Sequence, residues 1–232
     1  MKCETIIREN SYVSKDYLID YSLFYSRSFK EYPRFTQRLH FFSKRVSLGD
    51  LKEFLSKGYT CKITPELNRH YLGFTVIKPT LPSSLGKTVL KTYPEREKGN
   101  TRHFLKKRER VSFCGIPLEV HSLPFQEQDQ AVSACATVSL WICLHALQSL
   151  YHEGEVISPG EITQLAFSIY PFPKEPAFPS EGLLLPYQIL GFFRKLDWEC
   201  IEYDLEKGEV NIQFFEQLIK THIILARRYF LF

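Results

Sequence analysis

The 232-residue chain has ordinary shares of hydrophobic residues (44%) and charged residues (24%), while 19 Phe and 13 Tyr make it rich in aromatic side chains. This composition argues against an intrinsically disordered chain and predicts a folded protein with a sizeable core. The formal net charge of +4 is too mild, by itself, to indicate a nucleic-acid or membrane partner.

Signals for secretion and membrane insertion are absent from the sequence. The first residues, MKCETIIREN, are charged where a signal peptide needs an apolar core, and no window approaches the roughly 20 apolar residues of a membrane span. We therefore expect a cytoplasmic protein with no membrane partner. The six cysteines form no C-x-x-C pair and no Cys/His cluster at zinc spacing, so we expect free thiols, no metal and no cofactor.

The first elements in chain order predict a small N-terminal domain. Residues 21–42 interleave aromatic residues with Arg and Lys, and the simplest interpretation is an amphipathic segment with a solvated basic face. The sequence SLGDLKEFLSKG then predicts a short helix, capped by Ser47 and ended by Gly58. Residues 71–94 are typical of two β-strands around a Pro/Ser turn.

A charged and polar stretch, residues 95–110, predicts a solvated connector and a domain boundary. The predicted fold class is accordingly α+β, with a small N-terminal α/β domain over residues 1–110, whose role the sequence leaves open, and a second domain over residues 111–232. The second domain is expected to begin with a β-hairpin, because VSFCGIPLEVHSLPF alternates around a turn at Gly115.

Helices dominate the rest of the second domain. Residues 138–150 are apolar nearly all round and predict a centrally buried helix. A second helix should begin at Ser158, where S-P-G-E combines a cap, a first-turn proline and a glutamate three residues after the cap. A third helix is expected over residues 186–196. After it, WECIEYDL predicts a strand and NIQFFEQLIK a last helix.

Cys135 lies at the start of the central helix, in the stretch QEQDQAVSACATVSLW. If Ser133 caps this helix, the unpaired N–H groups and the positive end of the helix dipole favour a thiolate. A cysteine that attacks a carbonyl also needs donors for the developing oxyanion. Gln128 is the best candidate for this role, with Gln126 and Gln130 as substitutes. Alternatively, Cys135 is a small buried residue at a close helix contact.

The order Gln128-Asp129, a short spacer, Cys135 at the start of an apolar helix, and Trp141 within it resembles the papain-like cysteine peptidase superfamily. It is most similar to the bacteriocin-processing (double-glycine leader peptidase) branch, over at most residues 113–232. The resemblance implies a central buried helix packed against an antiparallel sheet. It also implies a thiol protease or amidase with a peptide or protein substrate, in which Cys135 is the nucleophile and Gln128 stabilises the oxyanion.

The sequence departs from the family pattern after the nucleophile and at the histidine. Ala136 stands where the family commonly has glycine, and the family's downstream histidine is followed by an Asn or Asp that orients it. His145 is ten residues along the predicted helix, about 15 Å of rise, and cannot reach the sulfur. His222 is the remaining candidate for the base, although no Asn or Asp follows it. The alternative is that the domain is incomplete and inactive, with the histidine strand missing.

Two other classes of function stay open. A non-catalytic binding or scaffold protein would retain the fold and hold a partner through the aromatic and basic residues 21–42. Nucleic-acid binding through residues 21–42 and 102–110 is a weaker expectation, because no ordered motif accompanies the basic residues.

Overall fold

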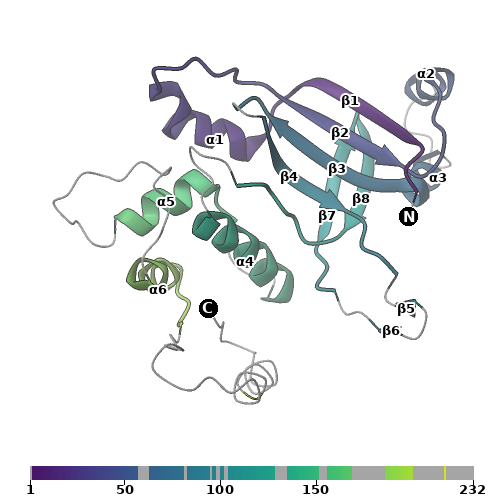
Figure 1. Cartoon of the computed structure of the whole chain (residues 1–232). Coiled ribbons are helices and arrows are strands. Elements are labelled where there is room, and N and C mark those ends of the chain that lie inside the picture. Colours follow the sequence, from purple (N-terminus) through teal and green to yellow (C-terminus); the bar gives the residue numbers. More distant parts are fainter. Residues whose placement is uncertain are drawn as a thin grey trace.

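The fold is mixed α+β, with antiparallel sheets and several helices (Figure 1). The computed structural model describes residues 2–56, 63–80, 83–94, 96–97, 100–101, 104–128, 135–151, 156–168, 186–200 and Gln217. The strands are β1 (Thr5–Tyr12), β2 (Thr36–Phe42), β3 (Tyr71–Lys78), β4 (Ser84–Leu90), β5 (Arg96–Glu97), β6 (Asn100–Thr101), β7 (Arg108–Phe113) and β8 (Ile116–His121). The helices are α1 (Lys15–Leu23), the short 3-10 helix η1 (Tyr25–Arg27), α2 (Leu48–Ser56), α3 (Ile63–His70), α4 (Cys135–Tyr151), α5 (Pro159–Phe167) and α6 (Pro186–Lys195).

A four-stranded antiparallel sheet in the order β1-β2-β3-β4 forms the N-terminal part. In its register, Leu39 of β2 faces Arg8 of β1 on one side and Thr75 of β3 on the other. Side chains of β2 alternate between buried and more exposed positions, as expected for a strand with one face in the core. The two predicted strands in residues 71–94 are confirmed as β3 and β4, whereas β1, α1 and β2 have no counterpart in the prediction.

The β7–β8 hairpin packs on the four-stranded sheet and shares its core, as Figure 1 shows. The predicted hairpin is confirmed, and it reverses at Cys114 and Gly115, both with positive φ. Arg38 of β2 ties the two layers together, because its side chain donates to Ser112 O at 2.6 Å and to Glu9 Oε2 at 2.6 Å. From the sequence, this hairpin is predicted to be the start of the second domain. In the structure, its apolar face packs against the four-stranded sheet of the N-terminal part. The shared core consists of Phe42, Leu67, Tyr71, Phe74, Val76, Val89, Val111, Phe113, Ile116, Leu118 and Val120.

The predicted short helix after the basic segment is confirmed as α2. Ser47 N donates to Asp50 Oδ2 at 2.8 Å, and Asp50 N donates back to Ser47 Oγ at 3.1 Å, so both partners of the cap are in place. The helix ends at Ser56, and Gly58, the predicted stop, lies outside the described residues.

Helices α4, α5 and α6 form a second apolar core beside the sheet (Figure 1). All three were predicted, and α5 carries the expected capping box between Ser158 and Glu161. Residues 198–200 form no regular element, while the rest of the predicted strand and nearly all of the predicted last helix, residues 211–220, lie outside the described residues. The buried residues of this core are Leu140, Trp141, Leu144, Leu147, Ile162, Ala166, Phe192, Phe193 and Cys200. Within the described ranges, every helix falls short of what a bilayer crossing requires.

Asp20 connects the sheet part to the helical part through α1 and α5, which lie side by side in Figure 1. Its carboxylate is almost fully buried, and Oδ1 accepts a hydrogen bond from Gly160 N at 2.8 Å in the first turn of α5. A Cβ on Gly160 would lie only 2.8 Å from that oxygen, so glycine permits the contact. Burial raises the pKa of Asp20 to about 7, despite the nearby Lys78 and the bond from Gly160.

We expect the titration of Asp20 to make the protein less stable as the pH rises. In the unfolded chain this carboxyl titrates near its ordinary value of 3.8, whereas in the folded chain its pKa is about 7. Between these values the native state holds a proton that the unfolded state has lost, so the free energy of unfolding falls with increasing pH. Asp20→Asn keeps the oxygen acceptor but cannot titrate. Urea unfolding at about pH 5 and about pH 8 should therefore show a smaller fall for the variant.

Asp50 provides a control with the opposite sign. Its hydrogen bonds with Ser47 lower its pKa, so its contribution to stability is lost as the pH falls. Asp50→Asn should consequently leave the loss of stability toward pH 8 in place. An unchanged pH dependence in Asp20→Asn would show that another group is responsible for it.

Candidate nucleophile at the start of helix α4

Cys135 is the first residue of the 17-residue helix α4, and its side chain is exposed. Two residues later the helix becomes buried, with Thr137 and Val138 facing the protein interior. Ser139 Oγ donates to the carbonyl of Cys135 at 2.9 Å, which ties the first residue to the next turn. The thiol therefore lies at the solvent-facing end of a buried helix, and it is not the small buried contact residue of the alternative interpretation. Ser133, the predicted cap, lies outside the described residues.

The two described glutamines upstream of Cys135 differ in their surroundings. Gln128, the predicted oxyanion donor, is exposed. Gln126 is buried, and its Nε2 has no hydrogen-bond partner in the part of the chain that the structure describes. Gln130, the other substitute, lies outside the described residues. The roles of Gln128 and Cys135 stay predictions, but of the two described glutamines Gln126 is the one with a spare donor inside the protein.

Pairing with β4 explains why Gln126 points inward. Thr88 N donates to Phe125 O at 2.7 Å, Phe125 N donates to Thr88 O at 2.8 Å, and Glu127 N donates to Leu85 O at 2.8 Å. The segment is therefore extended, and its side chains alternate between the two sides. Phe125 and Glu127 are exposed while Gln126 is buried. The sequence alone would place the apolar Phe125 inside and the polar Gln126 outside, and the strand that pairs with this segment lies about 40 residues earlier.

His145 is buried on α4 and is held in a structural contact. Its Nδ1 lies 2.9 Å from Lys107 Nζ, which also donates to Gln148 Oε1. An ammonium group can only donate, so Nδ1 accepts and the neutral ring carries its proton on Nε2. Burial, followed by the nearby Lys107 and Lys87, lowers the pKa of His145 to about 2. The expectation that His145 cannot serve as a base for Cys135 is confirmed.

The other described histidines lie in the sheet part. His40 is buried between Tyr71 Oη, at 2.9 Å from Nδ1, and Glu9 Oε2, at 3.2 Å from Nε2, and burial lowers its pKa to about 4. His70 ends α3 and His121 ends β8. Among residues of known placement, no histidine ring shares a hydrogen bond with Cys135. His222, the predicted candidate base, lies outside the described residues.

The aromatic residues of the basic segment pack mostly against one another. Tyr25 lies 5.6 Å from Tyr17 and 4.9 Å from Tyr32 between ring centroids, and Tyr17 Oη donates to Pro33 O at 2.8 Å. A platform for single-stranded nucleic acid needs open ring faces on which bases stack. The buried rings of Tyr17 and Tyr25 do not offer such faces, which weakens the nucleic-acid interpretation.

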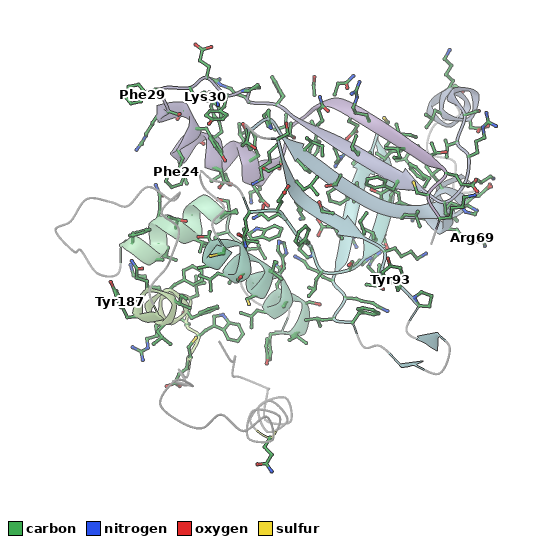
Figure 2. All side chains as sticks on the ribbon, in the orientation of Figure 1. Phe24, Phe29, Lys30, Arg69, Tyr93 and Tyr187 are labelled. Carbon is green, nitrogen blue, oxygen red and sulfur yellow. The ribbon has the colours of Figure 1, made fainter. Side chains whose placement is uncertain are left out.

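Phe29 is the exception in this segment. Its side chain is fully exposed on the loop after η1, next to Lys30, and Figure 2 shows both residues at the tip of that loop. Phe35, on the same loop, is also exposed. Phe29 and Phe35 are therefore aromatic side chains that the packing of the tyrosines leaves uncovered.

Metal ligands and similar proteins are two further sources of evidence about function. Of the residues that the structure describes, no three His, Cys, Asp or Glu side chains are grouped as metal ligands. Comparisons with protein-family models, with curated proteins and with solved structures found no match for the chain. The chemistry of the described residues is therefore the basis for a functional proposal.

Proposed function

We propose that the protein is a cysteine-nucleophile hydrolase of papain-like type, a peptidase or amidase, with Cys135 as its nucleophile. The observation that carries the proposal is the exposed thiol of Cys135 at the N-terminal end of the buried helix α4. At this position the free backbone N–H groups and the helix dipole favour negative charge on the sulfur and on a nearby oxyanion. The resemblance places the sheet that carries the histidine downstream of α6, outside the described residues.

In the proposed reaction, a base takes the proton of the Cys135 thiol, and the sulfur attacks the carbonyl carbon of a peptide amide. The carbonyl electron pair moves to the oxygen, which accepts hydrogen bonds from backbone N–H groups at the start of α4 and from a glutamine side chain. Gln128 is the donor that the resemblance implies, and the spare amide of Gln126 supports it as the alternative. The amine leaves with a proton from the base, and water then hydrolyses the thioester. Without His222 or another base in reach, the chain would be an inactive relative.

The rate of alkylation by iodoacetamide tests this proposal. At about pH 7 we expect Cys135 to react about ten times faster than Cys3, because a thiolate is the reactive form and helix N-termini favour it. Mass spectrometry of peptides from the full chain gives the rate at each cysteine. Cys3 is an exposed reference, and Cys143 is a half-buried one whose pKa is raised by burial.

Two results of the labelling decide between hydrolase and binding protein. Fast alkylation at Cys135, together with thiol-dependent peptide cleavage that Cys135→Ser abolishes, is the expected result. Alkylation of Cys135 no faster than that of Cys3 contradicts the hydrolase. A non-catalytic binding or scaffold protein would then be favoured, and the exposed Phe29 beside Lys30 is the observation that supports this second candidate.

A further inference from the structure

A cavity of about 500 Å³ lies where α3, the chain leaving β4 and the end of β8 meet. Its wall includes Asn68 of α3, Lys91 and Tyr93 after β4, Lys106 before β7, and His121 at the end of β8. This volume is within the range of sites that bind small molecules. Side chains from four separate segments of the chain therefore converge on one space.

The cavity is far from the candidate nucleophile. Ser149, near the C-terminal end of α4, donates from Oγ to the carbonyl of Lys106 at 3.0 Å. Cys135 begins the same helix 14 positions earlier, which corresponds to about 20 Å of helical rise. A ligand in this cavity would not contact the sulfur of Cys135, so the cavity is a separate site.

Two lysines and one carboxylate lie among the described residues of the cavity wall. Lys91 and Lys106 reach it from two segments of the chain, on either side of β5 and β6. Glu119 is the one carboxylate among the described lining residues. Arg108 binds Glu119 with two nitrogens, with its Nε 2.9 Å from Oε2, and compensates its charge. Lys91 forms no ion pair with any residue of known placement, so its ammonium group can bind an anion.

An aromatic ring lies beside these cations. Tyr93 is 61% exposed although it lines the cavity, and Figure 2 shows it close to the end of the sheet. Tyr71 lies deeper in the wall, is almost fully buried and is fixed by the hydrogen bond between its Oη and His40. A planar ligand can stack on an open tyrosine ring, while a neighbouring lysine binds an anionic group on the same molecule.

We propose that this cavity is a binding site for a small anionic molecule with a planar ring. The anionic group contacts Lys91, and the ring stacks on Tyr93. The proposal concerns a second site and does not depend on hydrolase activity at Cys135.

Calorimetric titration of the full chain with adenosine monophosphate and with isophthalate tests the site. Both probes combine a planar ring with an anionic group, which is a phosphate in adenosine monophosphate and a pair of carboxylates in isophthalate. Adenosine alone and inorganic phosphate alone should each bind at least about tenfold more weakly than adenosine monophosphate, because each lacks one half of the contacts. Binding of isophthalate without adenosine monophosphate would identify a carboxylate ligand, and the reverse result would identify a phosphate.

Variants locate the site. Lys91→Ala should weaken binding of the better probe about tenfold, as loss of a charge-assisted hydrogen bond does, and Tyr93→Ser should weaken it as well. Lys52→Ala removes the same charge from an exposed position on α2 and should leave the affinity unchanged. Because Lys91 and Tyr93 are exposed, both variants should keep the circular dichroism of the parent. The proposal is wrong if neither probe binds at about 10 mM, or if Lys91→Ala and Tyr93→Ser both bind as the parent does.

Discussion

Replacing Gly73 with alanine should destabilise the protein by about 3 kcal/mol or more. Gly73 lies in β3 with φ at 121°, a backbone conformation that residues with a side chain rarely adopt. A Cβ there would lie 2.0 Å from Val89 O and 2.9 Å from the Cα of Leu90. Because both neighbours are backbone atoms of the paired strand β4, they can move away only if the sheet itself is distorted.

Gly86, in β4, is the matched control for this change. The nearest atoms to a Cβ at Gly86 are side-chain atoms, Lys78 Cγ at 3.2 Å and two atoms of Val76 at 3.4 Å. Gly86→Ala should therefore change the free energy of unfolding by only about 1 kcal/mol or less. Urea unfolding followed by circular dichroism measures both variants. Equal losses for Gly73→Ala and Gly86→Ala would show that the close approach at Gly73 has little effect on stability.

Elements with a strong local signal could be predicted from the sequence. Ser158, Pro159 and Glu161 define the start of α5 within four residues, and Ser47 with Asp50 does the same for α2. The β7–β8 hairpin could also be predicted from its own residues, since Gly115 allows the turn and the alternation on either side marks the strands. In each case the residues that stabilise the element are its own neighbours.

The missed elements depend on contacts with distant parts of the chain. Helix α1 begins after Ser14, whose side chain forms no capping bond, and its buried Asp20 is satisfied by Gly160, 140 residues later. Strand β1 mixes polar and apolar residues, as an edge strand does, so no alternating pattern marks it clearly. The residues next to α1 and β1 in the sequence therefore do not reveal the distant segments that stabilise these two elements.

In the candidate site, too, some features could be predicted from the local sequence and others could not. The position of Cys135 at the start of a buried helix followed from the apolar residues after it, because helical burial has a local pattern. The burial of Gln126 did not follow, since it depends on hydrogen bonds between its segment and Thr88 and Leu85 of β4. The contact of Lys107 with His145 likewise joins a segment before β7 to α4. Local pattern predicted the position of Cys135, whereas tertiary pairing determines the burial of Gln126 and the contact of His145.

Trp141→Ala should destabilise the helical part by about 3–5 kcal/mol, the usual loss when a large buried aromatic side chain is removed. Trp141 is fully buried on α4 in the core shared with α5 and α6, and its ring meets the His145 ring edge-on at 4.4 Å between centroids. Its Nε1 has no hydrogen-bond partner among the residues that the structure describes. A buried donor without an acceptor is itself destabilising, so most of the favourable contribution of Trp141 comes from packing.

Trp141→Phe separates these two contributions, because it keeps an aromatic ring but removes the unpaired N–H. We expect this variant to lose much less stability than Trp141→Ala in urea unfolding, since the relief of the unpaired donor offsets part of the lost volume. The alkylation rate of Cys135 should stay at the parent value in Trp141→Phe, because the start of α4 lies about 9 Å of helical rise away from residue 141. A loss as large as that of Trp141→Ala would instead show that the indole N–H has an acceptor that stabilises α4.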